Sequence, residues 1–159
     1  MSTNKPGVSL DLLIPPPLVV ALFGLMMWVC AQELGGGRFT LVWPDLVIGL
    51  LLGSGLLLIG SAAGALLRAR TTVNPLRPGN TSTLVVTGVF RWSRNPIYLG
   101  DLLLLLAWVL WLGQLANLLL LAGYVGYMNR FQILPEERIL AQRFGEAYRA
   151  YCAKVRRWL

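Results

Sequence analysis

Long uncharged apolar runs constrain the fold of this 159-residue chain more than any other feature. Leu12–Gln32 and Leu46–Leu67 contain no charged residue, and each is long enough to cross a hydrocarbon core of about 30 Å as a helix. A soluble domain of this size could not bury so much apolar surface, because 56% of its residues are hydrophobic and only 13% are charged. The sequence therefore predicts one all-α integral-membrane domain over residues 1–159.

A third apolar run, Leu102–Asn129, is too long for one upright membrane helix, since its 28 residues would extend about 42 Å. Gly113-Gln114 and Asn117 mark a turn inside this run. We therefore predict a helical hairpin with spans at Pro96–Leu112 and from Leu115 to about Leu134. Together with the two earlier runs, this gives a bundle of four transmembrane helices.

The basic residues predict how this bundle is oriented. The segment from Arg68 to Arg94 carries five Arg and no acidic residue, and the tail from Arg130 carries seven Lys+Arg against three Glu. With four spans, both segments lie on the cytoplasmic side, as the positive-inside rule requires. We expect both termini in the cytoplasm and, for so short a chain, a bacterial inner membrane. The same rule accounts for the net charge of +7, so no nucleic-acid partner is expected.

The tail is predicted to form a cytoplasmic amphipathic helix over Pro135–Cys152, because its apolar residues recur at intervals of three or four. Arg156-Arg157-Trp158 would then anchor the tail at the membrane interface. In the second span, four glycines share one helix face that allows close approach of another helix. That face predicts packing within the bundle, a groove for a lipid, or a homo-oligomer; the glycines are Gly49, Gly53, Gly60 and Gly64.

Few residue types are available for chemistry. The chain has no His and two Cys, Cys30 and Cys152, without metal-ligand spacing, so no metal site is expected. Arg94-Asn95-Pro96 opens the third predicted span, with Asn95 as helix cap and Pro96 in the first turn. The free N–H groups and partial positive charge of such a helix end favour a carboxylate ligand.

A pair of acids, Glu136-Glu137, follows the last predicted span and lies on the same membrane face as Arg94. A ligand that carries both a carboxylate and cationic groups could bridge the basic motif and the acidic pair. Asp101 lies inside the third span, where an acid is costly and often functional. Its other interpretation is an interfacial partner for an arginine.

Several spaced motifs in this region occur together. They read T-L-V-x-T-G-V-F-x-x-x-R-N-P-x-Y-x-G, then the helical hairpin, then E-E-R-x-L-x-x-x-F-G-x-x-Y-x-x-Y, and finally V-R-R-W-L. Over Thr71–Leu159 this arrangement resembles the isoprenylcysteine carboxyl methyltransferase and phospholipid methyltransferase superfamily. The resemblance implies a methyltransferase that uses S-adenosyl-L-methionine and sits among membrane lipids. Residues 1–70 would supply two spans and residues 71–159 the cofactor-binding core, with a lipid-like or small hydrophobic acceptor entering from the bilayer.

The resemblance also implies roles for individual residues. Arg94 and Glu137 would position the reactants, although no catalytic residue is identified. Gln132 stands where eukaryotic carboxyl methyltransferases have a substrate-contacting Arg, so Gln132 and nearby Arg130 are the substrate-binding candidates. Asn95 replaces a frequent His, and Phe90 a frequent Tyr. The implied cofactor contacts are Ser82, Thr83, Leu84, Val85, Phe90, Arg94, Asn95, Pro96, Ile97, Tyr98 and Glu136.

Two other functions fit parts of the sequence. The segment Asn95–Leu103 together with Ala107-Trp108 also resembles the C-terminal part of sterol reductases, which use NADPH. The Glu136-Glu137 pair fits the methyltransferases better. A non-catalytic membrane scaffold is the third possibility, and it would bind neither cofactor.

Overall fold

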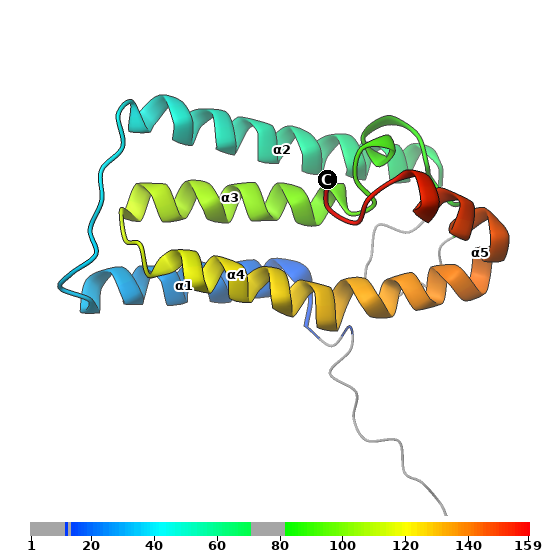
Figure 1. Cartoon of the computed structure of the whole chain (residues 1–159). Coiled ribbons are helices and arrows are strands. Elements are labelled where there is room, and N and C mark those ends of the chain that lie inside the picture. Colours follow the sequence, from blue (N-terminus) through cyan, green and yellow to red (C-terminus); the bar gives the residue numbers. More distant parts are fainter. Residues whose placement is uncertain (1–11, 13, 71–81) are drawn as a thin grey trace, which may run out of the picture.

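The computed structural model describes residues 12, 14–70 and 82–159, so Arg77 of the basic segment lies outside the described residues. No strand occurs among the described residues, which confirms the all-α class. Figure 1 shows how the helices are arranged. In chain order they are α1 (Pro16–Glu33), α2 (Pro44–Arg68), the 3₁₀ turn η2 (Gly88–Arg91), α3 (Pro96–Leu112), α4 (Asn117–Tyr127), the π-helical η3 (Met128–Ile133) and α5 (Leu134–Lys154).

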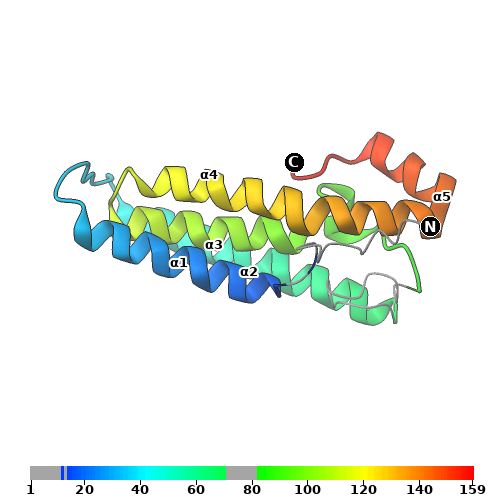
Figure 2. The same ribbon diagram turned by 90° about the horizontal axis from the view of Figure 1, so that it is seen from below.

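Proline and glycine set the ends of these helices. α1, α2 and α3 each begin with a proline in the first turn, where its fixed φ suits a helix and its missing N–H costs nothing. α3 ends at Gly113, whose φ of 62° is left-handed. The chain then turns back into α4, as the hairpin prediction required. From α4 the helix continues through η3 into α5, so these three form one long rod beside α1–α3 (Figures 1 and 2).

Two of the helices are long and apolar enough to cross a membrane. α1 has 18 residues with mean hydropathy 1.4, and α2 has 25 residues with mean hydropathy 2.2. The outer face of α2 is leucine-rich, with Leu50, Leu56 and Leu57 each more than 60% exposed. Such a surface is typical of a membrane protein. α3 is a shorter apolar helix of 17 residues, so the four-span topology and the cytoplasmic termini stay predictions.

The closest helix contact involves glycines that the sequence analysis did not select. A Cβ on Gly100 of α3 would lie 2.7 Å from the Gly55 carbonyl oxygen and 2.6 Å from Ile59 Cγ1 of α2. At Gly49, Gly53, Gly60 and Gly64 a Cβ would instead meet open space. Packing of that face within the chain was therefore the wrong prediction, because α3 docks on the Gly55 side of α2. A homo-oligomer formed through the open face stays a prediction.

Candidate functional site

A cavity of about 360 Å³ lies at the end of the bundle where α3 begins. Its volume falls within the range of about 300–1,000 Å³ that is usual for small-molecule sites. The helices α1, α2, α3 and α5 all contribute residues to this cavity, and most of its lining is apolar. The lining residues are Pro16 and Pro17 of α1, Ile59, Ala63 and Leu66 of α2, the loop and η2 residues Thr83, Leu84, Val85 and Phe90, then Arg94, Asn95, Pro96, Ile97, Tyr98 and Asp101, and Glu136, Glu137, Leu140, Tyr148 and Tyr151 of α5.

The N-terminus of α3 faces this cavity without a side-chain cap. Asn95 occupies the cap position, yet its side chain makes no capping hydrogen bond. The Asn95 Nδ2 atom instead donates to the Arg157 carbonyl oxygen at 2.9 Å. The predicted cap was therefore right in position and wrong in its hydrogen bond. As a result, the first-turn N–H groups of Ile97 and Tyr98 are left without a side-chain acceptor and can serve a ligand.

Glu136 is held inside the cavity by Tyr98. The Tyr98 hydroxyl donates a hydrogen bond to Glu136 Oε1, which joins the first turn of α3 to the first turn of α5. Burial raises the pKa of Glu136 to about 8; the Tyr98 hydrogen bond opposes the rise, and the neighbouring Glu137 carboxylate adds to it. An empty site therefore keeps Glu136 mostly protonated at neutral pH, and a cationic ligand would favour its ionised form.

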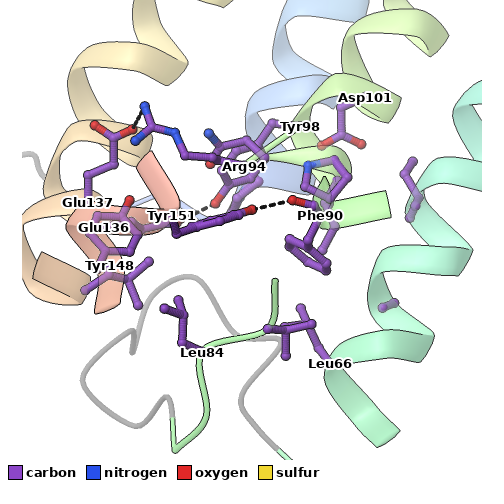
Figure 3. A pocket seen from close by; sticks show the side chains of 18 of the residues that line it. Leu66, Leu84, Phe90, Arg94, Tyr98, Asp101, Glu136, Glu137, Tyr148 and Tyr151 are labelled. Atoms are coloured by element: carbon purple, nitrogen blue, oxygen red, sulfur yellow. Dashed lines mark hydrogen bonds and ion pairs between the residues drawn. The ribbon is translucent and has the colours of Figure 1, made fainter. Parts of the chain in front are cut away.

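Glu137 pairs with two arginines. Its Oε1 atom lies 3.0 Å from Arg94 Nη2, and Arg157 donates to both of its oxygens, at 3.0 and 2.7 Å. The structure thus brings together the Arg94 motif and the acidic pair, as Figure 3 shows for Arg94 and Glu137. The Arg94 Nε atom is buried and has no hydrogen-bond partner among the described residues. An anionic group next to this atom would supply the missing acceptor.

Aromatic side chains of α5 close another wall of the cavity. Tyr148 and Tyr151 are buried in a cluster with Val155, against which Leu84 packs. The Tyr151 hydroxyl also donates to the Phe90 carbonyl oxygen at 2.7 Å, which fixes η2 against α5 (Figure 3). These contacts hold the loop before α3 in place as part of the cavity wall.

Ten of the eleven residues predicted to contact the cofactor line this one cavity. Ser82 does not; its hydroxyl donates to the Arg70 carbonyl oxygen at 3.0 Å. The two substrate-binding candidates also lie elsewhere. Gln132 is fully buried in η3 and donates to the Ile14 carbonyl oxygen at 2.5 Å, whereas the Arg130 guanidinium lies over the Phe131 ring. Neither residue lines this cavity, because Gln132 in η3 bonds to Ile14 just before α1, and their role at the substrate stays a prediction.

The structure adds cavity residues that were not among the predicted cofactor or substrate contacts, although Asp101 had been noted as an acid within a span. Asp101 lines the cavity and makes no hydrogen bond or ion pair with other described residues, so it is not the partner of an arginine there. Tyr148 and Leu140 come from the apolar face of the tail helix, which its periodicity had indicated. Nothing in the sequence indicated that Ile59 of α2 lines a cavity, because the leucine-rich faces of an apolar helix look alike in sequence.

The cavity therefore combines donors for an anion, a carboxylate for a cation, and aromatic and aliphatic walls. Comparison with known proteins identifies the family of this chain. The family model of the phospholipid methyltransferases matches residues 45–147. The chain belongs to the phospholipid methyltransferase family. The predicted superfamily is confirmed, and the protein is a membrane protein of a methyltransferase family.

Two relatives are similar to this chain, and the first of them supports the assignment. A protein-S-isoprenylcysteine O-methyltransferase from Xenopus laevis is 32% identical over 175 aligned positions, which cover 96% of this chain and 54% of the relative. An uncharacterized protein from Haemophilus influenzae is 49% identical over 63 residues, which cover 40% of this chain and the whole of that protein. The chain spans about half the length of the Xenopus enzyme. The activity of that whole enzyme is therefore not assigned to this chain.

Proposed function

We propose that this protein transfers a methyl group from S-adenosyl-L-methionine to a lipid-like or small hydrophobic acceptor that enters from the bilayer. The cavity at the start of α3 carries the proposal, because it gathers the motif from Arg94 to Tyr98 and Glu136 around one space. Family membership supports methyl transfer as the chemistry. The name of the Xenopus relative supports the same class of reaction.

The polar groups of the cavity match the charges of S-adenosyl-L-methionine, which carries a carboxylate, an ammonium group and a sulfonium group. The unpartnered Arg94 Nε and the first-turn N–H groups of α3 are suited to the carboxylate. The Glu136 carboxylate is suited to a cationic group. Phe90 and Tyr148 offer aromatic surface for the adenine ring.

When bound, S-adenosyl-L-methionine supplies an electrophilic methyl group on sulfur. The residues of this chain would hold the two reactants in line and keep water out, for which the aliphatic walls from Ile59 and Leu140 are suited. An acceptor that loses a proton on methylation needs a base in the cavity. Asp101 is available for that role, because the described residues give its carboxylate no hydrogen bond or ion pair.

The acceptor side favours molecules without a carboxylate. The wall formed by Pro16, Ala63 and Leu66 is apolar and belongs to the two helices that expose the most hydrophobic surface. The cation at the cavity, Arg94, pairs with Glu137 and is assigned in this proposal to the carboxylate of the cofactor, so it leaves no cation for a carboxylate on the acceptor. A buried carboxylate without its own cation is costly. We therefore predict that this protein methylates prenylcysteine poorly and prefers a neutral or lipid-like acceptor.

The proposal is tested with purified protein in lipid nanodiscs. Binding of S-adenosyl-L-methionine and of NADPH is measured by calorimetry, and radiolabelled methyl transfer is then screened against lipid, thiol, amine and carboxylate acceptors. We expect binding of S-adenosyl-L-methionine alone and transfer to a lipid-like acceptor. Binding of NADPH alone would favour a reductase, and binding of neither would favour a scaffold. Efficient methylation of prenylcysteine would refute the acceptor prediction.

A further inference from the structure

The end of the chain returns to the candidate site. α5 contains one residue with non-helical dihedrals, Gly145, with φ 51° and ψ −121°. The chain reverses there, so that the C-terminus lies near the start of α3 (Figure 1). We name residues Val155–Trp158 the C-terminal strap. The anchoring of this motif at the membrane interface stays a prediction, and the contacts below add a second role for it.

The backbone of the strap binds the segment that leads into α3. The Arg94 N–H donates to the Arg156 carbonyl oxygen at 3.0 Å. The next carbonyl, that of Arg157, accepts from Asn95 Nδ2 at 2.9 Å and from Ser93 Oγ at 3.4 Å. Three successive residues before α3 are thus fixed by two successive residues of the strap.

The side chains of the strap bind the other half of the site. Arg157 donates two hydrogen bonds to the Glu137 carboxylate, which also pairs with Arg94. At its far end, Trp158 Nε1 donates to Asn129 Oδ1 at 3.1 Å. Val155 is buried against the aromatic wall formed by α5. The strap therefore connects the start of α3 with the start of α5 and with η3.

We propose that the C-terminal strap positions the cofactor site, with Arg157 acting through Glu137 to hold Arg94 in place. Arg157 is a positioning residue: it does not line the cavity, whereas Arg94 and Glu137 both do. This inference rests on the proposed function, because it concerns how the same cavity is held ready for S-adenosyl-L-methionine.

The charges explain why one residue outside the cavity should matter. Glu137 is the shared partner of two guanidinium groups, and the side chains of Glu137 and Arg94 are only 16% and 14% exposed. A bidentate Arg157 fixes the orientation of the carboxylate, and the carboxylate in turn fixes Arg94. Without Arg157, Glu137 can rotate, and Arg94 loses the fixed partner that holds its guanidinium beside the cavity. A buried pair of this kind is sensitive to a change in either partner.

The first test measures the affinity for S-adenosyl-L-methionine in nanodiscs. Arg157→Gln should raise Kd about tenfold, and Arg157→Lys, which keeps the charge but loses the fork, about threefold. Arg149→Gln is the matched control, because Arg149 is exposed on α5 and pairs only with exposed Glu146. In a Glu137→Gln background, Arg157→Gln should add little, since the two residues act together. An additive loss in the double variant would overturn the inference, as would wild-type affinity in Arg157→Gln.

The second test needs no cofactor. Arg94 Nη1 donates to Cys152 Sγ, so displacement of Arg94 should uncover that thiol. In a Cys30→Ser background, maleimide labelling of Cys152 should be several-fold faster in Arg157→Gln and unchanged in Arg149→Gln. Unchanged labelling in Arg157→Gln would contradict the positioning role even if the protein were less stable. Wild-type protein that binds no S-adenosyl-L-methionine would refute the proposed function, while the labelling result would still decide the role of Arg157.

Discussion

Glu136→Gln tests the electrostatics of the cavity with a small change in shape. The substitution keeps a group that can accept the Tyr98 hydrogen bond and removes the carboxylate that would bind a cation. A hydrogen bond to a charged group contributes roughly 1.5–3 kcal/mol, so above the pKa of Glu136 the variant should bind S-adenosyl-L-methionine about 10- to 150-fold more weakly. The aromatic and aliphatic walls remain intact, so residual binding is expected.

The difference in affinity between wild type and Glu136→Gln should depend on pH, and the pKa of Glu136 gives the direction of that change. Because burial raises the pKa of Glu136 to about 8, this carboxyl is about nine-tenths protonated at pH 7 in the empty protein. Binding of a cation favours the ionised form and must first release that proton, which costs about 1.4 kcal/mol at pH 7. The contribution of Glu136 to affinity should therefore grow as pH rises toward the pKa and level off above it. The variant lacks this contribution at every pH.

Calorimetry can measure both quantities at once. Titrations in two buffers with different ionisation enthalpies report the protons released on binding, one pH unit below and one above the pKa. Wild-type protein should release close to one proton more than Glu136→Gln at the lower pH. Glu146→Gln serves as the control, because Glu146 is 85% exposed and lies outside the cavity. Equal affinity and equal proton release in wild type and Glu136→Gln would refute the role of Glu136.

Three further predictions concern topology and packing. Single cysteines at Gly36 and at Leu115, which is 51% exposed, should label from one side of the membrane and a cysteine at Ala153 from the other; labelling of all three from outside would exclude the four-span topology. Gly100→Ala should lower the free energy of unfolding by about 1–3 kcal/mol, since its Cβ would meet Gly55 and Ile59, whereas Gly60→Ala enters open space and should change it little. Gly145→Ala should cost a similar amount, roughly 1–3 kcal/mol, because φ 51° with ψ −121° is strained for any residue with a Cβ; a wild-type melting temperature would contradict this explanation of the kink.

Local patterns in the sequence predicted most of the secondary structure. Pro96 and Gly113 bound α3 as expected, and the polar residues after Leu112 turn the chain into α4. These features are readable because a proline, a glycine or an uncharged run acts on its own neighbours in the chain. The same holds for the cofactor-binding segment before α3, whose motif pointed to residues that the fold gathers around one cavity.

Contacts between distant residues were less predictable. All the glycines of α2 lie on an apolar helix. The sequence predicted packing within the bundle at Gly49, Gly53, Gly60 and Gly64, and not at Gly55. Gly55 is the one that meets Gly100, because the choice depends on where α3 docks. The family resemblance predicted that Gln132 contacts the substrate. In the structure Gln132 lies in a π-helical turn and donates to the Ile14 carbonyl oxygen. A single extra residue in a helical turn rotates every later side chain, and no periodic pattern reports it.

The sequence by itself determined that this is a membrane helical protein with a basic helix entrance and an acidic pair suited to a charged cofactor. Only the tertiary structure decided that Glu136 bonds to Tyr98, that Glu137 joins Arg94 to Arg157, and that the strap closes on this group. The physical reason is the range of the interactions. Hydrophobicity and backbone preference act over a few residues, whereas the ion pair between residues 94 and 137 forms only after α3, α4 and η3 have packed together. The bond from Arg157 to Glu137 also needs the reversal at Gly145.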